Sequence, residues 1–558
     1  MACSGDVSGL VARSQNQQGL PLGRTDSYGS TVMLRADHVH GLLAGALVLV
    51  LGFNEGGFSP ATWVWSVVPL AIVAGSLLSG QARRPSPLEL GFLAALAGLL
   101  GWTLISTIWS LDPTASLLDA QRLLLYVSTA AALVLLARPG SRPSLLAGVL
   151  VAVTVLCVAG LADAAVGDDP IGTATDDPGS EDRLAEPIGY ANGVAVLASM
   201  GMLLALGLAF VAARRSLRVA CVLLIPCLAL TQYLTYSRGG WLALAVGLLA
   251  LLVVRLGSLD RRIVVVGGVV LLLAVTVAGV AFARSFSAPT TTPAEGAARL
   301  RTLSGSSRAD YWRVALRTVE DEPLLGSGSG SYRRTWYRNR SVPQPARDAH
   351  SLYLETLAEL GPLGLLLLLV ALGLPLAAAV TARTDPLTPP ALGAYVAFLA
   401  HAAQDWDWEL PAVTVPALAC AVALLLTGRR RWAPLGQAAR FMGGAVAVVL
   451  VVVSLAAYAG NRELALAENG SDRSARRAAR LQPWSAEPWR VLGEAQLERG
   501  ELDAARESFR EGLSRDDGDW ELWIDLALSS EGSARRDAFA RAVRLNPRDP
   551  DLLELREE

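Results

Sequence analysis

The sequence contains no lysine, so arginine supplies every basic side chain apart from four histidines. Only 18% of its 558 residues are charged, whereas a soluble globular protein carries about 25%. The formal net charge of −2 gives no support for a nucleic-acid partner. Five cysteines without zinc-type spacing predict neither a metal site nor a disulfide framework. These shortages argue against a soluble protein and against a nucleic-acid binder.

Apolar residues make up 52% of the chain and gather in long runs. A helix needs about 20 apolar residues to cross a bilayer, and hydropathy predicts thirteen runs. Their cores are residues 39–53, 61–79, 88–108, 117–137, 144–166, 188–212, 217–236, 239–255, 263–283, 362–382, 389–404, 411–427 and 438–459. The first is short, and the two after residue 389 are also compatible with one broken pair. We therefore predict an all-α, polytopic membrane protein with 12 or 13 transmembrane helices.

Arginines alternate along the connections between these runs. Cytoplasmic connections of membrane proteins are enriched in basic residues, and here every second connection carries them. The basic connections contain Arg83, Arg84, Arg138, Arg142, Arg214, Arg215, Arg218, Arg255, Arg261, Arg262, Arg383, Arg429, Arg430 and Arg431. The other connections are neutral or acidic. This pattern predicts a multi-pass plasma-membrane protein whose N-terminus is cytoplasmic.

Composition divides the chain into three parts. Residues 1–38 are rich in Ser, Gly and Gln, which predicts a disordered segment. Residues 39–459 form the predicted transmembrane domain, which includes a long extracytoplasmic stretch at 284–361. Residues 460–558 form a polar tail, and an odd number of spans places this tail on the extracytoplasmic side.

The tail contains a repeated pattern. "LQPWSAEPW", "LSRDDGDWELW" and "LNPRDPDLL" begin at residues 481, 513 and 545, so they recur every 32 residues. The amphipathic stretch "LGEAQLERGELDAARESF" between the first two resembles tetratricopeptide repeats, whose period is about 34 residues. Such repeats are helix pairs that stack and present a concave binding face. We predict a small helical-repeat domain that can hold a protein partner.

Arg238 lies between two apolar runs in "TYSRGGWLAL", residues 235–244. A charge near a bilayer is costly, so this arginine is either an anchor at a helix end or a functional group. As an anchor, it extends its charged head to the interface. As a functional group, its planar and permanently charged guanidinium suits phosphate oxygens. Both interpretations stay open from this stretch alone.

The stretch 302–340 is rich in arginine and glycine. Its arginines include Arg308, Arg313, Arg317, Arg333 and Arg334. The "GSGSGS" run lacks the Lys-Ser/Thr element of a nucleotide-binding loop, and we expect a tight turn whose backbone amides face an anion. Trp312, Tyr332 and Trp336 are candidates for stacking on sugars. A solvated basic face is the alternative interpretation of the same stretch.

Two histidines occupy polar positions near predicted span ends. His350 precedes a predicted helix in "ARDAHSLYLETLAELGPLGLL". An imidazole can act as a general base near neutral pH, although a lone histidine is more often structural. His401 and Asp405 are four residues apart in "HAAQDWDWELP". Because no third metal ligand is evident, we expect these two to form a buried hydrogen-bonded pair, and Asp405 or Asp407 to shape an outer cavity.

Four segments follow one another in a characteristic order: "RLAEPIGYAN" at 183–192, "SRGG" at 237–240, "SSRADYWRVALRTVEDEPLLGSGSGSY" at 306–332 and "AHSLYLETLAELGPLG" at 349–364. Together they resemble the O-antigen ligase and O-antigen polymerase-like family of integral membrane glycosyltransferases. The resemblance covers about residues 40–430. The family usually has His-Asn where this chain has His350 followed by Ser351, a departure that leaves the histidine itself in place.

The resemblance implies a transfer without metal or cofactor, in which glycan passes from a polyprenyl-pyrophosphate donor to a hydroxyl of a glycan, lipid or protein. It implies that Arg238 and Arg308 hold the pyrophosphate and that His350 is the base. A single direct displacement would invert the anomeric centre. We assign further substrate contacts to Arg183, Asn192, Trp312, Tyr332, Arg333, Trp336 and Asp405.

Three alternatives remain open. A ligase or a protein O-glycosyltransferase would use the same chemistry with another acceptor. A transporter would show paired inverted repeats and charges inside its spans, whereas the charges here lie mostly at span edges. A non-catalytic scaffold would only display the repeats, and it would not need a histidine and clustered arginines in a long outer stretch.

Overall fold

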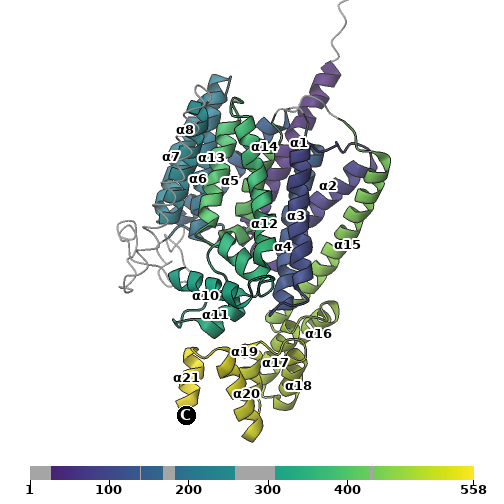
Figure 1. The fold of residues 1–558 in the computed structure, drawn as a ribbon, viewed down its shortest axis with the longest axis vertical. Coiled ribbons are helices and arrows are strands. Elements are labelled where there is room, and N and C mark those ends of the chain that lie inside the picture. Colours follow the sequence, from purple (N-terminus) through teal and green to yellow (C-terminus); the bar gives the residue numbers. More distant parts are fainter. Residues whose placement is uncertain (1–26, 139, 167–182, 258–307, 428–432, 558) are drawn as a thin grey trace, which may run out of the picture.

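The computed structural model describes residues 27–138, 140–166, 183–257, 308–427 and 433–557. Within these ranges the regular secondary structure is helical and contains no strand. Most of the helices run side by side in one bundle, and the others lie at one end of it (Figure 1). The predicted all-α fold is therefore confirmed.

The bundle consists of the helices that contain the predicted apolar runs. They are α1 (Ser27–Gly52), α2 (Val67–Leu78), α3 (Pro87–Ser106), α4 (Pro113–Leu136), α5 (Ser141–Val166), α6 (Ala191–Val211), α7 (Arg215–Leu234), α8 (Arg238–Gly257), α12 (Leu352–Thr381), α13 (Thr388–Ala402), α14 (Pro411–Leu425) and α15 (Gln437–Glu468), with 3-10 turns η1 (Glu55–Gly57), η2 (Pro60–Ser66) and η4 (Asp407–Glu409). Among the described residues, nine helical segments are long and apolar enough to cross a membrane, and His38–Gly52 and Pro411–Leu425 are shorter apolar helices. The protein is a multi-pass membrane protein.

Twelve of the thirteen predicted runs coincide with these helices, and the run at 263–283 lies outside the described residues. The two short runs after residue 389 form separate helices, α13 and α14, which pack against each other. Each has 15 residues and is therefore about 22 Å long. Every residue of α14 is buried, so α14 is a core helix surrounded by other helices.

Helix α1 begins at Ser27, inside the segment for which the sequence predicts disorder. Residues 27–38 are helical, because extending an existing helix is far less costly than starting a new one. Residues 1–26 lie outside the described residues. The assignment of residues 1–38 to a disordered segment stays a prediction, although α1 extends into its second part.

Close helix packing depends on glycines at the contact between α1 and α5. A Cβ added to Gly45 would lie 3.0 Å from the carbonyl oxygen of Gly148, and a Cβ on Gly148 would collide with the backbone of Gly41. Small residues four positions apart let membrane helices approach closely. Helices α8 and α13 meet in the same way, because a Cβ on Gly247 would lie 2.6 Å from the carbonyl oxygen of Gly393.

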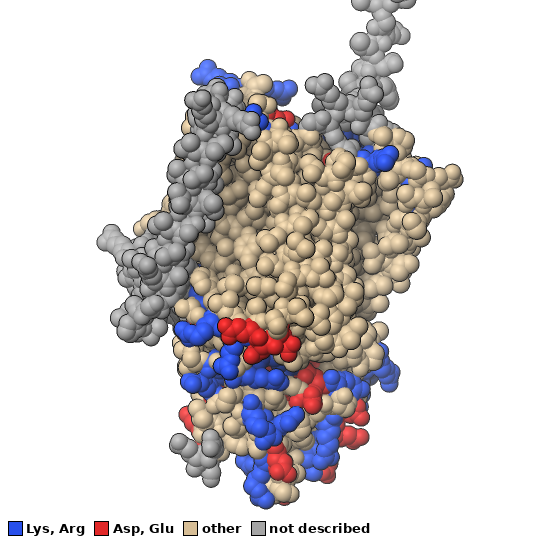
Figure 2. Space-filling model, viewed as in Figure 1, with Lys and Arg blue, Asp and Glu red and all other residues tan. Residues whose placement is uncertain are grey.

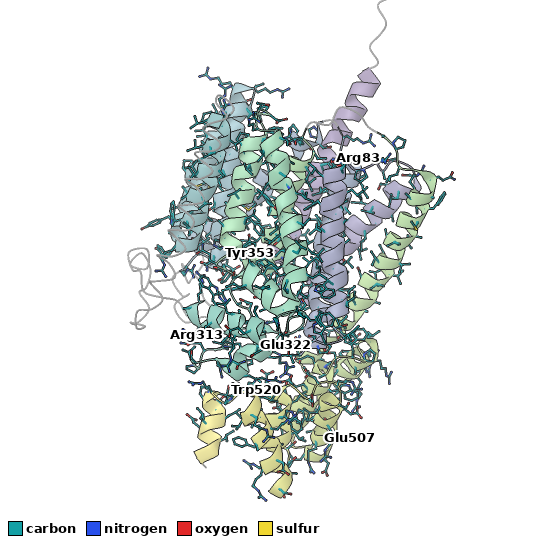
Figure 3. All side chains as sticks on the ribbon, in the orientation of Figure 1. Arg83, Arg313, Glu322, Tyr353, Glu507 and Trp520 are labelled. Carbon is teal, nitrogen blue, oxygen red and sulfur yellow. The ribbon has the colours of Figure 1, made fainter. Side chains whose placement is uncertain are left out.

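On the face seen in Figure 2, an uncharged belt lies between two charged ends of the molecule. Arg83 lies at the end opposite the tail (Figure 3), where it forms a two-point ion pair of 2.9 Å with Glu89. Arg142, at the start of α5, and Asp385, in the connection between α12 and α13, form a second ion pair of 2.6 Å. The connections that are rich in arginine therefore include specific ion pairs as well as solvated charges.

The helices outside the bundle belong to two segments. Helices α10 (Arg308–Asp321) and α11 (Tyr332–Asn339) lie between the bundle and the tail (Figure 1). The tail contains α16 (Asp472–Leu481), α17 (Glu487–Glu498), α18 (Leu502–Leu513), α19 (Trp520–Leu528), α20 (Gly532–Leu545) and α21 (Pro550–Glu557). Leu481, Leu513 and Leu545 end α16, α18 and α20, so each 32-residue period contains one helix pair. Assignment of these pairs to tetratricopeptide repeats stays a prediction.

Candidate functional site

Polar side chains from five segments meet where the bundle faces α10 and α11. The segments are residues 183–192, the turn between α7 and α8, the start of α10, residues 348–350, and the turn between α13 and α14. They bring together most of the residues that the resemblance predicted, although these are far apart in the sequence.

Asp405 is the fully buried centre of this group, which we name the Asp405 cluster. One carboxylate oxygen accepts hydrogen bonds from Arg308 Nη2 at 2.8 Å and Asn192 Nδ2 at 2.7 Å. The other oxygen accepts a hydrogen bond from the Tyr190 hydroxyl at 2.7 Å. Burial alone would raise the pKa of this carboxyl, but the Arg308 guanidinium and the nearby histidines lower the pKa of Asp405 to about 2. The ionised carboxylate therefore holds Arg308 in place.

Arg183 fixes one side of the Asp405 cluster. This buried arginine donates from Nε to the carbonyl oxygen of Thr235 at 2.8 Å and from Nη2 to Asn192 Oδ1 at 2.5 Å. It thereby ties the start of α6 to the end of α7. Tyr190 makes no side-chain capping bond at the start of α6, so the alternative of simple helix capping does not describe its hydroxyl, which binds Asp405.

Arg238 is the first residue of α8, and α8 begins beside the end of α13. A Cβ added to Gly239 would lie 3.2 Å from His401 Nε2 and 3.2 Å from Gln404 Nε2. The preceding turn contains Tyr236 in the left-handed region, at φ 46°. A helix N-terminus carries a partial positive charge and readily binds anions. The half-buried Arg238 adds a full positive charge at the same point.

His350 forms a close pair with Asp348. Its Nδ1 lies 2.8 Å from Asp348 Oδ1, and its backbone N–H donates to the same oxygen at 3.2 Å. The φ angle of His350 is 51°, a left-handed conformation that is uncommon for a residue other than glycine. Burial lowers the pKa of the imidazole, but the Asp348 carboxylate more than offsets this effect, so the pKa of His350 is raised. The imidazole keeps 20% exposure.

His401 pairs with Asp407, so the predicted pair with Asp405 is wrong. Its Nδ1 lies 3.0 Å from one Asp407 oxygen and 3.1 Å from the other, and both side chains are buried. The prediction assumed that one helix continues through residue 405. Helix α13 ends at Ala402, so Asp405 does not follow helical spacing from His401.

The amides of the glycine-rich loop bind a carboxylate of this same chain. Gly330 N and Tyr332 N each donate to the Glu359 carboxylate at 2.8 Å. Gly328 N donates to the Glu359 carbonyl oxygen at 2.8 Å, and Ser327 N donates to another carbonyl of α12 at 3.0 Å. The expectation that these amides face a ligand anion is therefore wrong, because Glu359 occupies them.

Tyr332 and Trp336 form a small core with Tyr311. They are 1% and 0% exposed, and the Trp336 ring centre lies 4.8 Å from that of Tyr311. Protein covers both rings, so this placement removes them from the candidates for sugar stacking. Their spacing of four residues along α11 is the sequence signal for a buried helix face. Trp312, on α10, is half-buried.

Three further observations concern the predicted site. Arg333 interacts electrostatically with Glu521 of α19, so it belongs to the contact between α11 and the tail. Asp348 was missed from the sequence, although an aspartate side chain often forms a turn by accepting from the backbone N–H two residues on, as Asp348 does from His350. Among the described residues, no group of three or more His, Cys, Asp or Glu side chains is arranged to hold a metal ion.

One comparison with known proteins covers part of the site. Residues 219–369 match the model of the family described as O-antigen ligase, and this stretch contains Arg238, Arg308 and His350. No curated protein matches the chain. The resemblance stated from the sequence is confirmed for residues 219–369, which carry an O-antigen ligase domain within this multi-pass membrane protein, and the match supports a ligase- or polymerase-type membrane enzyme of polysaccharide biosynthesis.

Proposed function

We propose that the protein transfers glycan from a polyprenyl-pyrophosphate donor to an acceptor hydroxyl at the extracytoplasmic face of the plasma membrane. The observation that carries this proposal is the meeting of two pairs at one end of the bundle, His350 with Asp348 and Arg308 with Asp405. The first pair suits proton transfer by the imidazole, and the guanidinium of the second pair suits the binding of an anion. In this arrangement the N-terminus is cytoplasmic and the tail is extracytoplasmic, because the arginine-rich connections lie opposite the site.

On the donor side, Arg308 and Arg238 neutralise the pyrophosphate. The polyprenyl chain stays in the lipid beside the uncharged belt, and its pyrophosphate reaches the charged end of the bundle (Figure 2). Arg308 is held by a buried carboxylate, and Arg238 lies at the positive end of α8. Groups that are positioned in advance stabilise the charge that develops on a leaving group without further reorganisation.

On the acceptor side, His350 is the general base. Asp348 faces Nδ1, which leaves Nε2 to take the proton from the acceptor hydroxyl. The acceptor oxygen forms a bond to the anomeric carbon while the bond from that carbon to the pyrophosphate oxygen breaks. The bonding electrons leave with the polyprenyl pyrophosphate, and the configuration at the anomeric carbon is inverted. No metal ion or cofactor takes part in this step.

The acceptor decides between a polymerase, a ligase and a protein O-glycosyltransferase, which share this chemistry. A further repeat unit as acceptor makes the protein a polymerase, and a lipid or a protein makes it a ligase or a protein glycosyltransferase. A transporter or a scaffold would have no use for a histidine oriented by a carboxylate beside a fixed arginine.

The test is the cell-surface glycan profile of a strain that carries His350→Ala, with membrane abundance measured in parallel. We expect loss of long glycan chains with single units retained if the protein is a polymerase, and full-length glycan on its lipid carrier if it is a ligase. His38→Ala is the matched control, because His38 is exposed and lies on α1, away from the site. An unchanged profile at normal abundance of the His350 variant would exclude His350 as the base.

A further inference from the structure

The tail covers one face of α11 through a buried charge cluster. Arg334, 5% exposed, forms ion pairs with Asp112 at 3.2 Å, with Asp519 at 3.7 Å and with Asp516. Asp112 caps the N-terminus of α4, whereas Asp516 and Asp519 lie between α18 and α19 of the tail. One guanidinium thus joins the bundle, α11 and the tail.

A second contact lies at the other end of α11. Arg340, 3% exposed, donates to Asn546 Oδ1 at 2.8 Å and lies 3.6 Å from Asp549. The rings of Tyr337 and Trp520 meet edge to face, with centres 5.9 Å apart. Figure 3 shows Trp520 at the top of the tail, directly below the segment with α10 and α11. The tail therefore holds α11 at both ends.

The other face of α11 leads to His350. Tyr332 and Trp336 pack in the small core with Tyr311, and the Tyr332 hydroxyl donates to the Tyr311 carbonyl oxygen at 2.8 Å. The Tyr311 ring centre lies 4.8 Å from the imidazole of His350. Packed side chains therefore connect the tail to His350 in three steps, through α11, Trp336 and Tyr311.

We propose that the C-terminal tail is a positioning element of the transferase, which orients His350 by fixing α11 and, through it, Tyr311. Arg334, Asp516 and Asp519 are the positioning residues of this contact. The proposal rests on the function proposed above and extends it to a part of the chain outside residues 219–369, which match the O-antigen ligase family.

Charge explains why this contact is specific. A buried guanidinium needs partners that satisfy its charge and its hydrogen bonds. Asp112 supplies one carboxylate, and the tail supplies the other two. Without the tail carboxylates, Arg334 would keep one partner and would draw α11 towards water. Since a displacement of about 1 Å at a catalytic group can cost as much as 100-fold in rate, a loosened α11 is enough to slow transfer.

The experiment compares two variants of the full-length protein in lipid nanodiscs. Asp516→Asn combined with Asp519→Asn removes the tail charges at Arg334. Asp472→Asn is the matched control, because it breaks an exposed ion pair of the tail with Arg499, 2.9 Å long, and touches nothing on α11. Two quantities are measured: kcat and KM for a synthetic polyprenyl-pyrophosphate donor, and the rate at which diethyl pyrocarbonate labels His350, read by peptide mass spectrometry.

We expect the double variant to lose about 10-fold in kcat with the donor KM within about twofold, because the buried Asp405 still holds Arg308 and because Arg238 lies on α8. We also expect His350 to be labelled faster, with His38 as the internal reference. If kcat and labelling both match the Asp472→Asn control, the proposal is overturned. Should the double variant not fold, Asp549→Asn, which weakens the contact with Arg340, takes its place with the same expected direction.

The two readouts separate this inference from the function on which it rests. If the wild-type protein does not use the donor, the proposed function fails, whereas faster labelling of His350 in the double variant still supports the positioning role. If the wild-type protein is active and labelling of His350 is unchanged, the positioning role fails and the proposed function stands.

Discussion

Replacing Asp405 by asparagine removes the charge at the centre of the site and keeps its size. Oδ1 accepts from Tyr190 and from the Trp406 amide at 2.9 Å, and Oδ2 accepts from Arg308 and Asn192. In Asp405→Asn, an amide group at the Oδ2 position would face two donors. The variant loses the hydrogen bond from the charged Arg308, worth about 1.5–3 kcal/mol, and the hydrogen bond from the neutral Asn192 amide, worth about 1 kcal/mol. The total is about 3 kcal/mol.

The pKa of Asp405 supports the same magnitude. The site lowers it to about 2, whereas an aspartate in an unfolded chain has a pKa of about 3.9, so the ionised form gains about 2–3 kcal/mol from the fold. Because this pKa is depressed, the gain is fully present at pH 7 and is lost only as the pH falls from about 4 towards 2.

The assay is donor turnover per folded molecule at neutral pH. A loss of about 3 kcal/mol in the alignment of Arg308 corresponds to roughly 100-fold in kcat/KM. Asp385→Asn is the matched control, because it breaks the ion pair with Arg142 at the opposite end of the bundle, and its turnover per folded molecule should stay normal. Wild-type kcat/KM in Asp405→Asn would refute the reasoning that Asp405 prepares Arg308 for the donor.

Three further substitutions test the site. Asp348 raises the pKa of His350, and a general base must be neutral, so Asp348→Asn should lower the maximal rate and move the acid side of the pH–rate profile to lower pH; an unmoved profile contradicts the role. Gly239→Val brings side-chain atoms against His401 and should raise the donor KM by displacing the start of α8, whereas an unchanged KM argues against a donor site there. Gly328 has φ 96°, so Gly328→Ala should destabilise the loop by about 1–3 kcal/mol in thermal unfolding; an unchanged midpoint would show that the loop relaxes freely.

Apolar run length made the membrane helices predictable from the sequence. Burying a span in lipid requires about 20 consecutive apolar residues, and this requirement is written into each segment independently of its neighbours. Tertiary packing decided the exceptions. Helix α14 has 15 residues and is buried on all sides, a property that depends on which helices surround it. The start of α1 at Ser27 depends on the apolar residues that follow it.

The site was predictable in its residues and only partly in its pairs. Arg238, Arg308 and His350 belong to motifs that the sequence displays, but which carboxylate pairs with Arg308 and which with His401 depends on where α13 ends. His401 pairs with Asp407 because α13 stops at Ala402. Helical spacing alone could not show this end, because the residues after it remain compatible with a helix.

The basic stretch shows why charge counts cannot separate a solvated face from a buried contact. Arg313 is 66% exposed and pairs only with its helix neighbour Asp310 among the ion pairs of the described residues, as expected for a solvated face. Arg334 lies on the next helix and is 5% exposed, because Asp516 and Asp519 reach it from the tail. Both arginines lie in the same stretch rich in arginine and glycine. Only the fold brings carboxylate partners about 180 residues away into contact with Arg334. The same stretch is therefore solvated on α10 and buried against the tail on α11.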